Sequence, residues 1–193
     1  MGMISLDPKR STAVLFPGMS TLVTCKEGDK DNIIAITWQS SLCGDPPTVG
    51  ISVTPKRFSY NLIKNSGEYI INIPNRDLLW ELHYCGRTSG RDVDKFKETG
   101  LTREKASILE DTPQIKECIA HVECKICKVY SIANDAYSFF VADVVGITVD
   151  DRYFDKISGW KTGIGNTETL HYLGGTRYAV LGETLDYKDI VRP

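Results

Sequence analysis

The sequence lacks the segments that mark membrane, exported and nucleic-acid-binding proteins. Its longest apolar runs are far shorter than the roughly 20 residues of a membrane-spanning helix. The opening residues, MGMISLDPKR, contain no apolar core of a signal peptide. Basic and acidic residues are mixed along the chain and the net charge is −2, so no basic block indicates a nucleic-acid surface. The sequence therefore predicts a cytoplasmic protein with neither a nucleic-acid nor a membrane partner.

Common catalytic signatures are absent as well. The chain contains neither GxSxG nor HExxH, and its histidines, His83, His121 and His171, lie in no such motif. No Walker sequence occurs. Gly163-Ile164-Gly165 lacks the third glycine of the GxGxxG fingerprint and does not open a helix. We therefore expect neither a hydrolase nor a dinucleotide-binding Rossmann site.

The sequence contains one candidate metal site, in which residues of metal-ligand type are spaced by threes: Cys118, His121, Cys124 and Cys127. Thiolate and imidazole are ligands that zinc prefers. In a strand, however, alternation sends Cys124 to one face and Glu123 and Cys127 to the other. We interpret the group as two core thiols and two exposed polar residues, with a metal-binding regulatory module as the alternative. Without an export signal, the six cysteines are expected to be free thiols.

The length and patterning predict one mainly β domain over residues 1–193. Apolar, β-branched runs predict strands at residues 21–25, 32–38, 48–54, 68–73, 120–130, 137–149 and 177–182. Helices are predicted at residues 57–64 and about 76–85, with a helical turn at residues 94–98. Because no βαβ rhythm is present, we predict an antiparallel barrel of six to seven strands with a few short helices.

Several boundaries follow from turn and cap residues. Residues 39–47 are expected to form a hydroxyl-rich loop between two strands, closed by Pro46-Pro47. Thr54 and Pro55 resemble an N-cap and first residue of the next helix, and Gly67 its C-cap. Gly86 is expected just beyond the end of the second helix.

Polar side chains gather where the strand at residues 48–54 passes into this first helix. They are Gln39, Ser40, Ser41, Thr54, Arg57 and Tyr60. The first turn of a helix has free N–H groups and the positive end of the helix dipole, so such a cluster suits an anion. An ordinary scaffold with surface polar residues is the alternative that the residues themselves leave open.

Four segments, taken in order, resemble the flavin reductase-like family, flavoredoxin-like proteins in particular. They are residues 32–38 (NIIAITW) with Ser41, Pro46-Pro47 and residues 50–53 (GISV); residues 67–74 (GEYIINIP); residues 89–96 (SGRDVDKF); and residues 171–178 (HYLGGTRY). The resemblance extends over about residues 12–183. It implies an FMN-binding, Greek-key split β-barrel and a homodimer with FMN near its interface.

The resemblance also implies a set of cofactor-binding residues. The turn at residues 37–41 would lie along the flavin, and Ser52 and Val53 would approach its ring or ribityl chain. Arg57 and Tyr60 would serve the phosphate, and residues 89–95 would close over the site. The full set is Thr37, Trp38, Gln39, Ser40, Ser41, Ser52, Val53, Arg57, Tyr60, Ser89, Gly90, Arg91, Asp92 and Lys95. No residue is expected to be catalytic, because hydride transfer through a flavin does not require a general base.

The activity implied is that of an FMN-dependent oxidoreductase. NADH, NADPH or a redox protein would supply electrons, and a flavin, metal or protein would accept them. The alternatives are a non-catalytic flavin carrier and a split barrel that binds another ligand, such as haem or a deazaflavin. Two features stay open: Cys43 is either a packing thiol or a thiol near the ring, and residues 159–168 are either a flap or a surface excursion.

Overall fold

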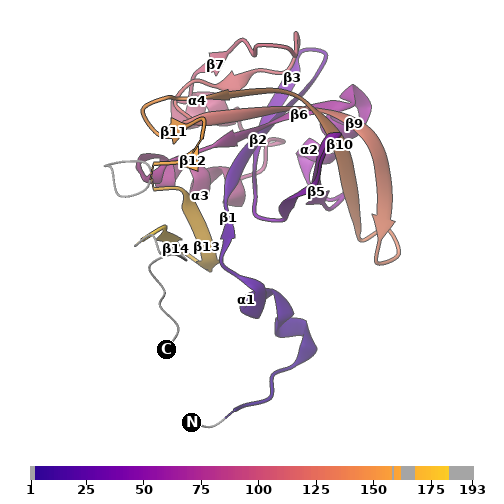
Figure 1. Cartoon of the computed structure of the whole chain (residues 1–193). Coiled ribbons are helices and arrows are strands. Elements are labelled where there is room, and N and C mark those ends of the chain that lie inside the picture. The colour runs from indigo at the N-terminus through magenta and orange to yellow at the C-terminus, as the bar shows by residue number, and fades with distance from the viewer. Residues whose placement is uncertain (1–2, 158, 162–167, 183–193) are drawn as a thin grey trace.

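A curved seven-stranded antiparallel sheet forms the body of the protein (Figure 1). The computed structural model describes residues 3–157, 159–161 and 168–182. In sheet order the strands are β3 (Lys30–Ile36), β2 (Thr21–Glu27), β6 (Glu68–Ile73), β9 (Ala120–Ile132), β10 (Tyr137–Val149), β5 (Pro47–Val53) and β4 (Gln39–Gly44). The mainly β, antiparallel fold predicted from the sequence is confirmed.

The two edge strands of this sheet are consecutive in the chain. β3 ends at Ile36 and β4 begins at Gln39, so only Thr37 and Trp38 join the two edges. The three Cα–Cα steps from Ile36 to Gln39 keep the Cα atoms of these two residues within roughly 11 Å of each other. The sheet must therefore curl until its edges approach, although β3 and β4 do not pair with each other. The result is a barrel with one open seam at Thr37 and Trp38.

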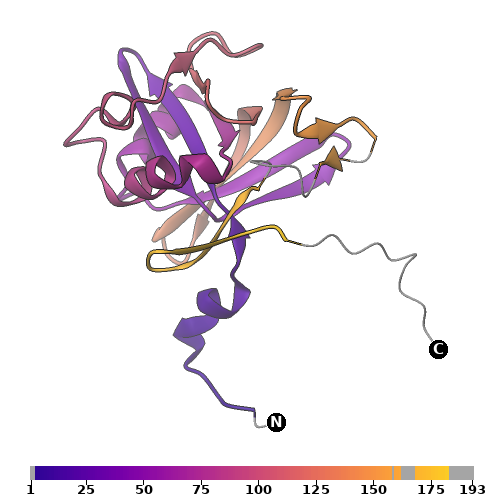
Figure 2. The same cartoon turned by 90° about the vertical axis from the view of Figure 1, so that its left-hand side faces the viewer.

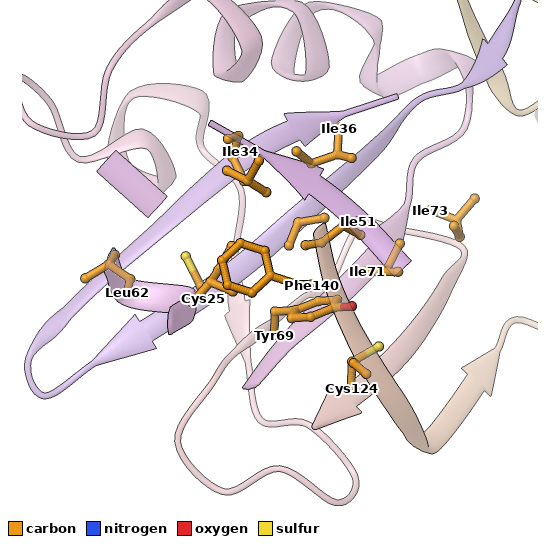
Figure 3. Packing of buried hydrophobic residues seen from close by; sticks show 14 of the residues in the cluster. Cys25, Ile34, Ile36, Ile51, Leu62, Tyr69, Ile71, Ile73, Cys124 and Phe140 are labelled. Carbon is orange, nitrogen blue, oxygen red and sulfur yellow. The ribbon is translucent and has the colours of Figure 1, made fainter. Parts of the chain in front are cut away.

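The inside of the barrel is a hydrophobic core. Figure 3 shows Phe140 of β10, Ile51 of β5, and Tyr69 and Ile71 of β6 pointing toward one another. Phe140 and Tyr69 are fully buried. Helix α2 (Phe58–Ser66) adds Leu62 and Ile63 to this core.

Two helices cover the outer side of β2 and β3. α3 (Leu79–Arg87) and α4 (Lys95–Thr99) pack there in a second cluster that includes Leu22, Ile33 and Phe96. β2 and β3 are thus buried on both faces over much of their length, which explains their nearly continuous apolar sequences. This second layer also forms one wall of the cavities described below.

The remaining elements surround the barrel. Strands β1 (Gly18–Met19), β13 (Leu170–Gly174) and β14 (Arg177–Val180) form a separate sheet beneath it, and the amino-terminal segment with α1 (Ser11–Leu15) projects away from it (Figures 1 and 2). The short elements are η1 (Pro8–Arg10), η2 (Arg76–Leu78), β7 (Arg103–Glu104), β8 (Gln114–Ile115), β11 (Phe154–Asp155) and β12 (Gly159–Trp160). None of the described helices is long and apolar enough to cross a membrane.

Several local predictions are confirmed. β6 spans the predicted residues 68–73, and Gly67 ends α2 in a left-handed conformation with φ +74°. β9 and β10 form the predicted hairpin, with positive φ at Ala133, Asn134 and Asp135 in its turn. Of the segment at residues 159–168, Gly159 and Trp160 pair with β11, whereas residues 162–167 lie outside the described residues.

The predicted hydroxyl-rich loop is instead a strand. β4 pairs antiparallel with β5, from Gln39 opposite Ile51 to Gly44 opposite Pro47. Its side chains are mostly exposed, so hydrophobic periodicity gives no signal there. Polar side chains suit an edge strand, which pairs on one side only.

The start of α2 also differs from the prediction. Thr54 does not cap the helix; its carbonyl accepts a hydrogen bond of 3.0 Å from the Arg57 backbone amide, which makes a turn of residues 54–57. The helix begins at Phe58, and Arg57 is its N-cap without any side-chain capping hydrogen bond. Gly86 lies inside α3, not beyond its end as predicted. A Cβ at this position would be only 3.3 Å from the Ala35 Cβ, so the absence of a side chain lets α3 pack closely against β3.

The Cys118–Cys127 region departs from the predicted burial pattern at two positions. Glu123 is fully buried, because the Ser107 hydroxyl and the backbone amides of residues 107–109 donate hydrogen bonds to its carboxylate. His121 is buried too, with Nδ1 2.9 Å from Asn72 Oδ1. Cys118 and Cys124 are buried thiols and Cys127 is exposed. Over the described part of the chain, no group of three or more His, Cys, Asp or Glu side chains is arranged to hold a metal ion.

Candidate functional site

Three adjoining cavities follow β3 along the outside of the barrel. The seam cavity, about 170 Å³, lies at Trp38; the middle cavity, about 210 Å³, lies at His83; and the loop cavity, about 150 Å³, lies at Ser89. Ala35 and Arg57 line all three. Each alone is smaller than a usual cofactor pocket. Because they share these two residues, we treat them as one site, called the β3 groove below.

The seam cavity has an aromatic wall. It lies where the two edges of the sheet approach, and β5 contributes Ser52 and Val53 to it. The Trp38 and Tyr137 rings are 5.2 Å apart at an interplanar angle of 46°. Trp38 remains 40% exposed. A planar ligand entering the seam would therefore meet aromatic side chains on one side and strand backbone on the other.

The loop cavity lies at the amino-terminal end of α2. The N-cap Arg57 and the first helical residues Phe58 and Ser59 line it, and Thr88 to Arg91 line it from the loop after α3. The uncapped first turn of a nine-residue helix presents N–H groups and a positive dipole end. Among the described residues, the Arg57 side chain has no hydrogen-bond or ion-pair partner. The guanidinium is therefore available to an anion.

Lys95 is a buried cation beside the same cavity. It is 4% exposed, and its Nζ donates hydrogen bonds of 2.7 Å to the carbonyl oxygens of Ile33 and Cys85. No carboxylate in the described structure pairs with it. Burial lowers the pKa of Lys95, and the nearby Arg57 charge adds to that lowering. An anion in the cavity would offset both effects.

The middle cavity brings the separate sheet beneath the barrel against α3. His83 Nδ1 lies 3.1 Å from the Tyr178 hydroxyl, and the Arg87 guanidinium donates a 2.9 Å hydrogen bond to the Gly175 carbonyl. Tyr172 lines the cavity beside Tyr178, with ring centroids 5.3 Å apart. These contacts fix an aromatic surface from the carboxyl-terminal part of the described chain next to Arg57.

The charge of the β3 groove has one sign. Five basic residues line it, and no described Asp or Glu does; the five are Lys56, Arg57, Arg87, Arg91 and Lys95. The whole protein carries a net charge of −2, so this concentration is local. A cleft lined by one sign of charge attracts ligands of the other sign. The groove is therefore suited to a ligand with an aromatic ring and an anionic group.

Residues 13–177 match the model of the flavin reductase like domain family. The chain belongs to this family. A protein of uncharacterised function from Pyrococcus abyssi is 30% identical over 142 residues, which cover 74% of this chain and 80% of that protein.

Solved structures agree with the family assignment. The FMN-binding protein of Thermus thermophilus superposes with a TM-score of 0.83 at 22% identity, covering 96% of this chain and 99% of that one. Flavoredoxin of Desulfovibrio vulgaris (Miyazaki F) superposes with a TM-score of 0.76 at 25% identity, covering 98% and 96%. The split β-barrel expected from the sequence is thus the fold of this flavin reductase-like protein.

Nine of the fourteen residues predicted to bind the cofactor line the groove of this flavin reductase-like chain. They are Thr37, Trp38, Ser52, Val53, Arg57, Ser89, Gly90, Arg91 and Lys95. Sequence segments more than 30 residues apart therefore meet at one site. Lys95 differs in detail from the prediction, because its ammonium is held by two backbone carbonyls within the wall.

The other five line none of the three cavities. The Gln39 side-chain amide donates to the carbonyl of Met19 in β1 at 2.6 Å. The Tyr60 hydroxyl is 3.0 Å from the Ser138 hydroxyl, and its ring packs on Phe140 in the core. The remaining three are Ser40 and Ser41, which lie in the exposed edge strand β4, and Asp92, which lies in the loop between α3 and α4 but lines a separate hollow. Cys43 is also exposed in β4, with its Sγ 3.3 Å from the Asp45 carbonyl oxygen.

Sequence reasoning missed several residues that line the groove. Ala35 carries no functional group that would mark it as a site residue. It matters because its side chain is small at the point where the three cavities meet. Tyr137 carries only a strand signal in the sequence, and His83 belongs to no catalytic motif. Tyr172 and Tyr178 fall within the family-like segment at residues 171–178, which was the available signal.

Proposed function

We propose that the β3 groove binds FMN and that the protein transfers electrons through it. The observation that carries this proposal is the meeting of three cavities at Arg57, with five basic residues and no described acidic residue in their walls. The phosphate of FMN would bind in the loop cavity. There Arg57 can donate two parallel hydrogen bonds to phosphate oxygens, and the amides of the first turn of α2 can add to them.

The flavin ring would lie toward the seam cavity. Trp38 and Tyr137 offer it a stacking surface, and the backbone of β5 near Ser52 offers polar groups to its edge. The small side chain of Ala35 leaves room for the ligand to pass between the loop cavity and the seam cavity. The chain's own residues thus bind the phosphate, orient the ring and shield one of its sides from water.

FMN, when bound, supplies the capacity to accept a hydride or electrons and to pass them on. The donor in this proposal is NADH, NADPH or a redox protein, and the acceptor is a flavin, metal centre or protein. The middle cavity, with Tyr172, Tyr178 and Arg87, offers a second substrate a site next to the ring.

A homodimer forms part of the proposal. Large apolar side chains are exposed near the seam and on the β9–β10 hairpin, with Trp38 at 40%, Tyr130 at 46% and Ile132 at 45% exposure. Tyr137 links them, because its ring lies 5.2 Å from that of Trp38 and it pairs opposite Ile132 in the hairpin. Adjoining exposed apolar side chains are typical of a protein interface. Light scattering on the purified protein should give twice the chain mass of 21.5 kDa.

The test of the proposed function is an absorbance spectrum of the protein mixed with FMN, recorded before and after anaerobic addition of NADH or NADPH. We expect the visible flavin bands to shift on binding and to bleach with at least one donor. Bound FMN that neither nucleotide reduces would favour a flavin carrier or a protein electron donor. A flavin spectrum unchanged by the protein would contradict the proposal.

A further inference from the structure

An outer hollow lies on the far side of the loop that ends the β3 groove. It has a volume of about 560 Å³, and it shares with the loop cavity only Phe58, Gly90 and Arg91. These three residues therefore stand between the groove and the hollow. We call them the end wall.

The end wall is tightly fitted to the barrel. A Cβ on Gly90 would lie 2.2 Å from Asn32 Oδ1 and 2.8 Å from Phe58 Cδ1, so the loop backbone touches both residues. The Arg91 guanidinium donates a 3.1 Å hydrogen bond to the Lys56 carbonyl and lies 5.9 Å from the Phe58 ring centroid. The loop is thus fastened to β3 and to the start of α2.

The sign of the charge changes across this wall. On the groove side, Lys56, Arg57 and Lys95 line the loop cavity without a described carboxylate. The outer hollow is lined by four aspartates, Asp29, Asp31, Asp92 and Asp94, and by three basic residues, Lys30, Arg91 and Arg103. Arg103 pairs with two of the aspartates, at 2.6 Å from Asp31 and 3.0 Å from Asp94. The lining thus carries one more acidic than basic residue, so a further anionic group in the hollow would meet a net negative charge.

We propose that the end wall makes the groove selective for flavin monophosphate over FAD. This inference rests on the proposed binding of a flavin in the groove. The single phosphate of FMN ends on the basic side of the wall. FAD continues through a second phosphate to adenosine, which would have to displace Arg91 and enter the acidic hollow. Discrimination thus comes from a steric barrier and from like charges placed against the larger ligand.

Isothermal titration of the cofactor-free protein with FMN, FAD and riboflavin tests the proposal on the wild type, three single variants and one double variant. Arg91→Ala opens the wall, Arg91→Met keeps its bulk without its charge, and Arg152→Ala removes an exposed arginine that pairs with Asp150 elsewhere. We expect the wild type to bind FMN at least about tenfold more tightly than FAD. Arg91→Ala should reduce the ratio of FMN affinity to FAD affinity about tenfold by strengthening FAD binding. The double variant that combines Arg91→Ala with Asp92→Asn should reduce this ratio further.

The controls separate the causes. Arg91→Met should weaken FMN without strengthening FAD, and Arg152→Ala should match the wild type. Equal affinity of the wild type for FMN and FAD, or the same ratio in the Arg91→Ala and Arg91→Met proteins, would overturn the inference while leaving FMN binding intact. A wild-type protein that binds none of the three flavins would overturn the proposed function as well.

Discussion

Arg57 and Lys95 line the same cavity, and none of the described residues that line it with them is acidic. Lys95 is held by two backbone carbonyls, whereas the Arg57 side chain has no polar partner in the described structure. Two neighbouring cations without a counter-charge repel each other, and burial strengthens the repulsion. A bound phosphate would relieve it, so both residues should respond to FMN.

Replacing Arg57 by alanine should weaken FMN binding by about 10- to 100-fold, because hydrogen bonds to a charged group contribute roughly 1.5–3 kcal/mol. Binding of riboflavin, which has no phosphate, should change little. Tyr60→Phe is the matched control: its hydroxyl bonds Ser138, so FMN affinity should stay at the wild-type value. Titration calorimetry measures the affinity of Arg57→Ala for FMN and for riboflavin, and the affinity of Tyr60→Phe for FMN. Unchanged FMN affinity in Arg57→Ala would move the phosphate site elsewhere.

Gly90→Ala should displace the loop over the loop cavity. The added Cβ would meet Asn32 Oδ1 at 2.2 Å, well inside contact distance, so the backbone of the loop must move. We expect FMN affinity to fall about tenfold, with a small loss of thermal stability. Gly44→Ala is the control, because nothing lies within 4 Å of a Cβ there. Equal affinities of the two variants would show that the loop position does not matter for the ligand.

The parts of this fold that were predictable have strong local signals. β6 combines an apolar, β-branched run with a glycine before it and a proline after it, and its predicted bounds are those observed. β4 had no such signal, because an edge strand with exposed serines has the composition of a loop. The start of α2 was misplaced because Thr54 and Pro55 suit a turn as well as a helix start, and only the contacts of Arg57 distinguish them.

The candidate site was predictable only where the family resemblance covered it. Spacing alone placed Arg57 and Tyr60 together, but their side chains point to different surroundings: one to the groove, the other to Phe140 in the core. The burial of Glu123 was hidden because its partners come from residues 107–109, in a separate segment of the chain. Contacts between distant segments of this kind leave no periodic trace in a sequence.

Glu123→Gln should lower the free energy of unfolding by about 2–3 kcal/mol. Burial would raise the pKa of this carboxyl, but hydrogen bonds from Ser107 and the amides of Ile108 and Leu109 outweigh it and hold the pKa below 4.5. In the variant an amide NH₂ would face N–H donors and leave them unpaired. Urea unfolding measures the loss. Glu110→Gln, at an exposed site, should change stability by less than about 0.5 kcal/mol, and a similar loss in both variants would contradict this account.

Stability should fall as the pH drops below about 6.5 because of His121. Burial lowers the pKa of His121 in the folded protein from its usual 6.5, and His171 is affected in the same direction. Between the two pKa values the unfolded chain binds more protons, so acid favours unfolding there. His121→Asn keeps a donor near Asn72 but does not titrate, and should show a weaker decline in melting temperature from pH 7 to about pH 5. An equal decline in both proteins would exclude His121 as a cause.

The most direct measurement of the central claim is a crystal structure of the protein with FMN. We expect electron density for the cofactor along β3, with its phosphate within hydrogen-bonding distance of Arg57 and its ring beside Trp38 and Tyr137. FMN bound away from the groove, or a groove that remains empty when FMN is bound in solution, would contradict the account.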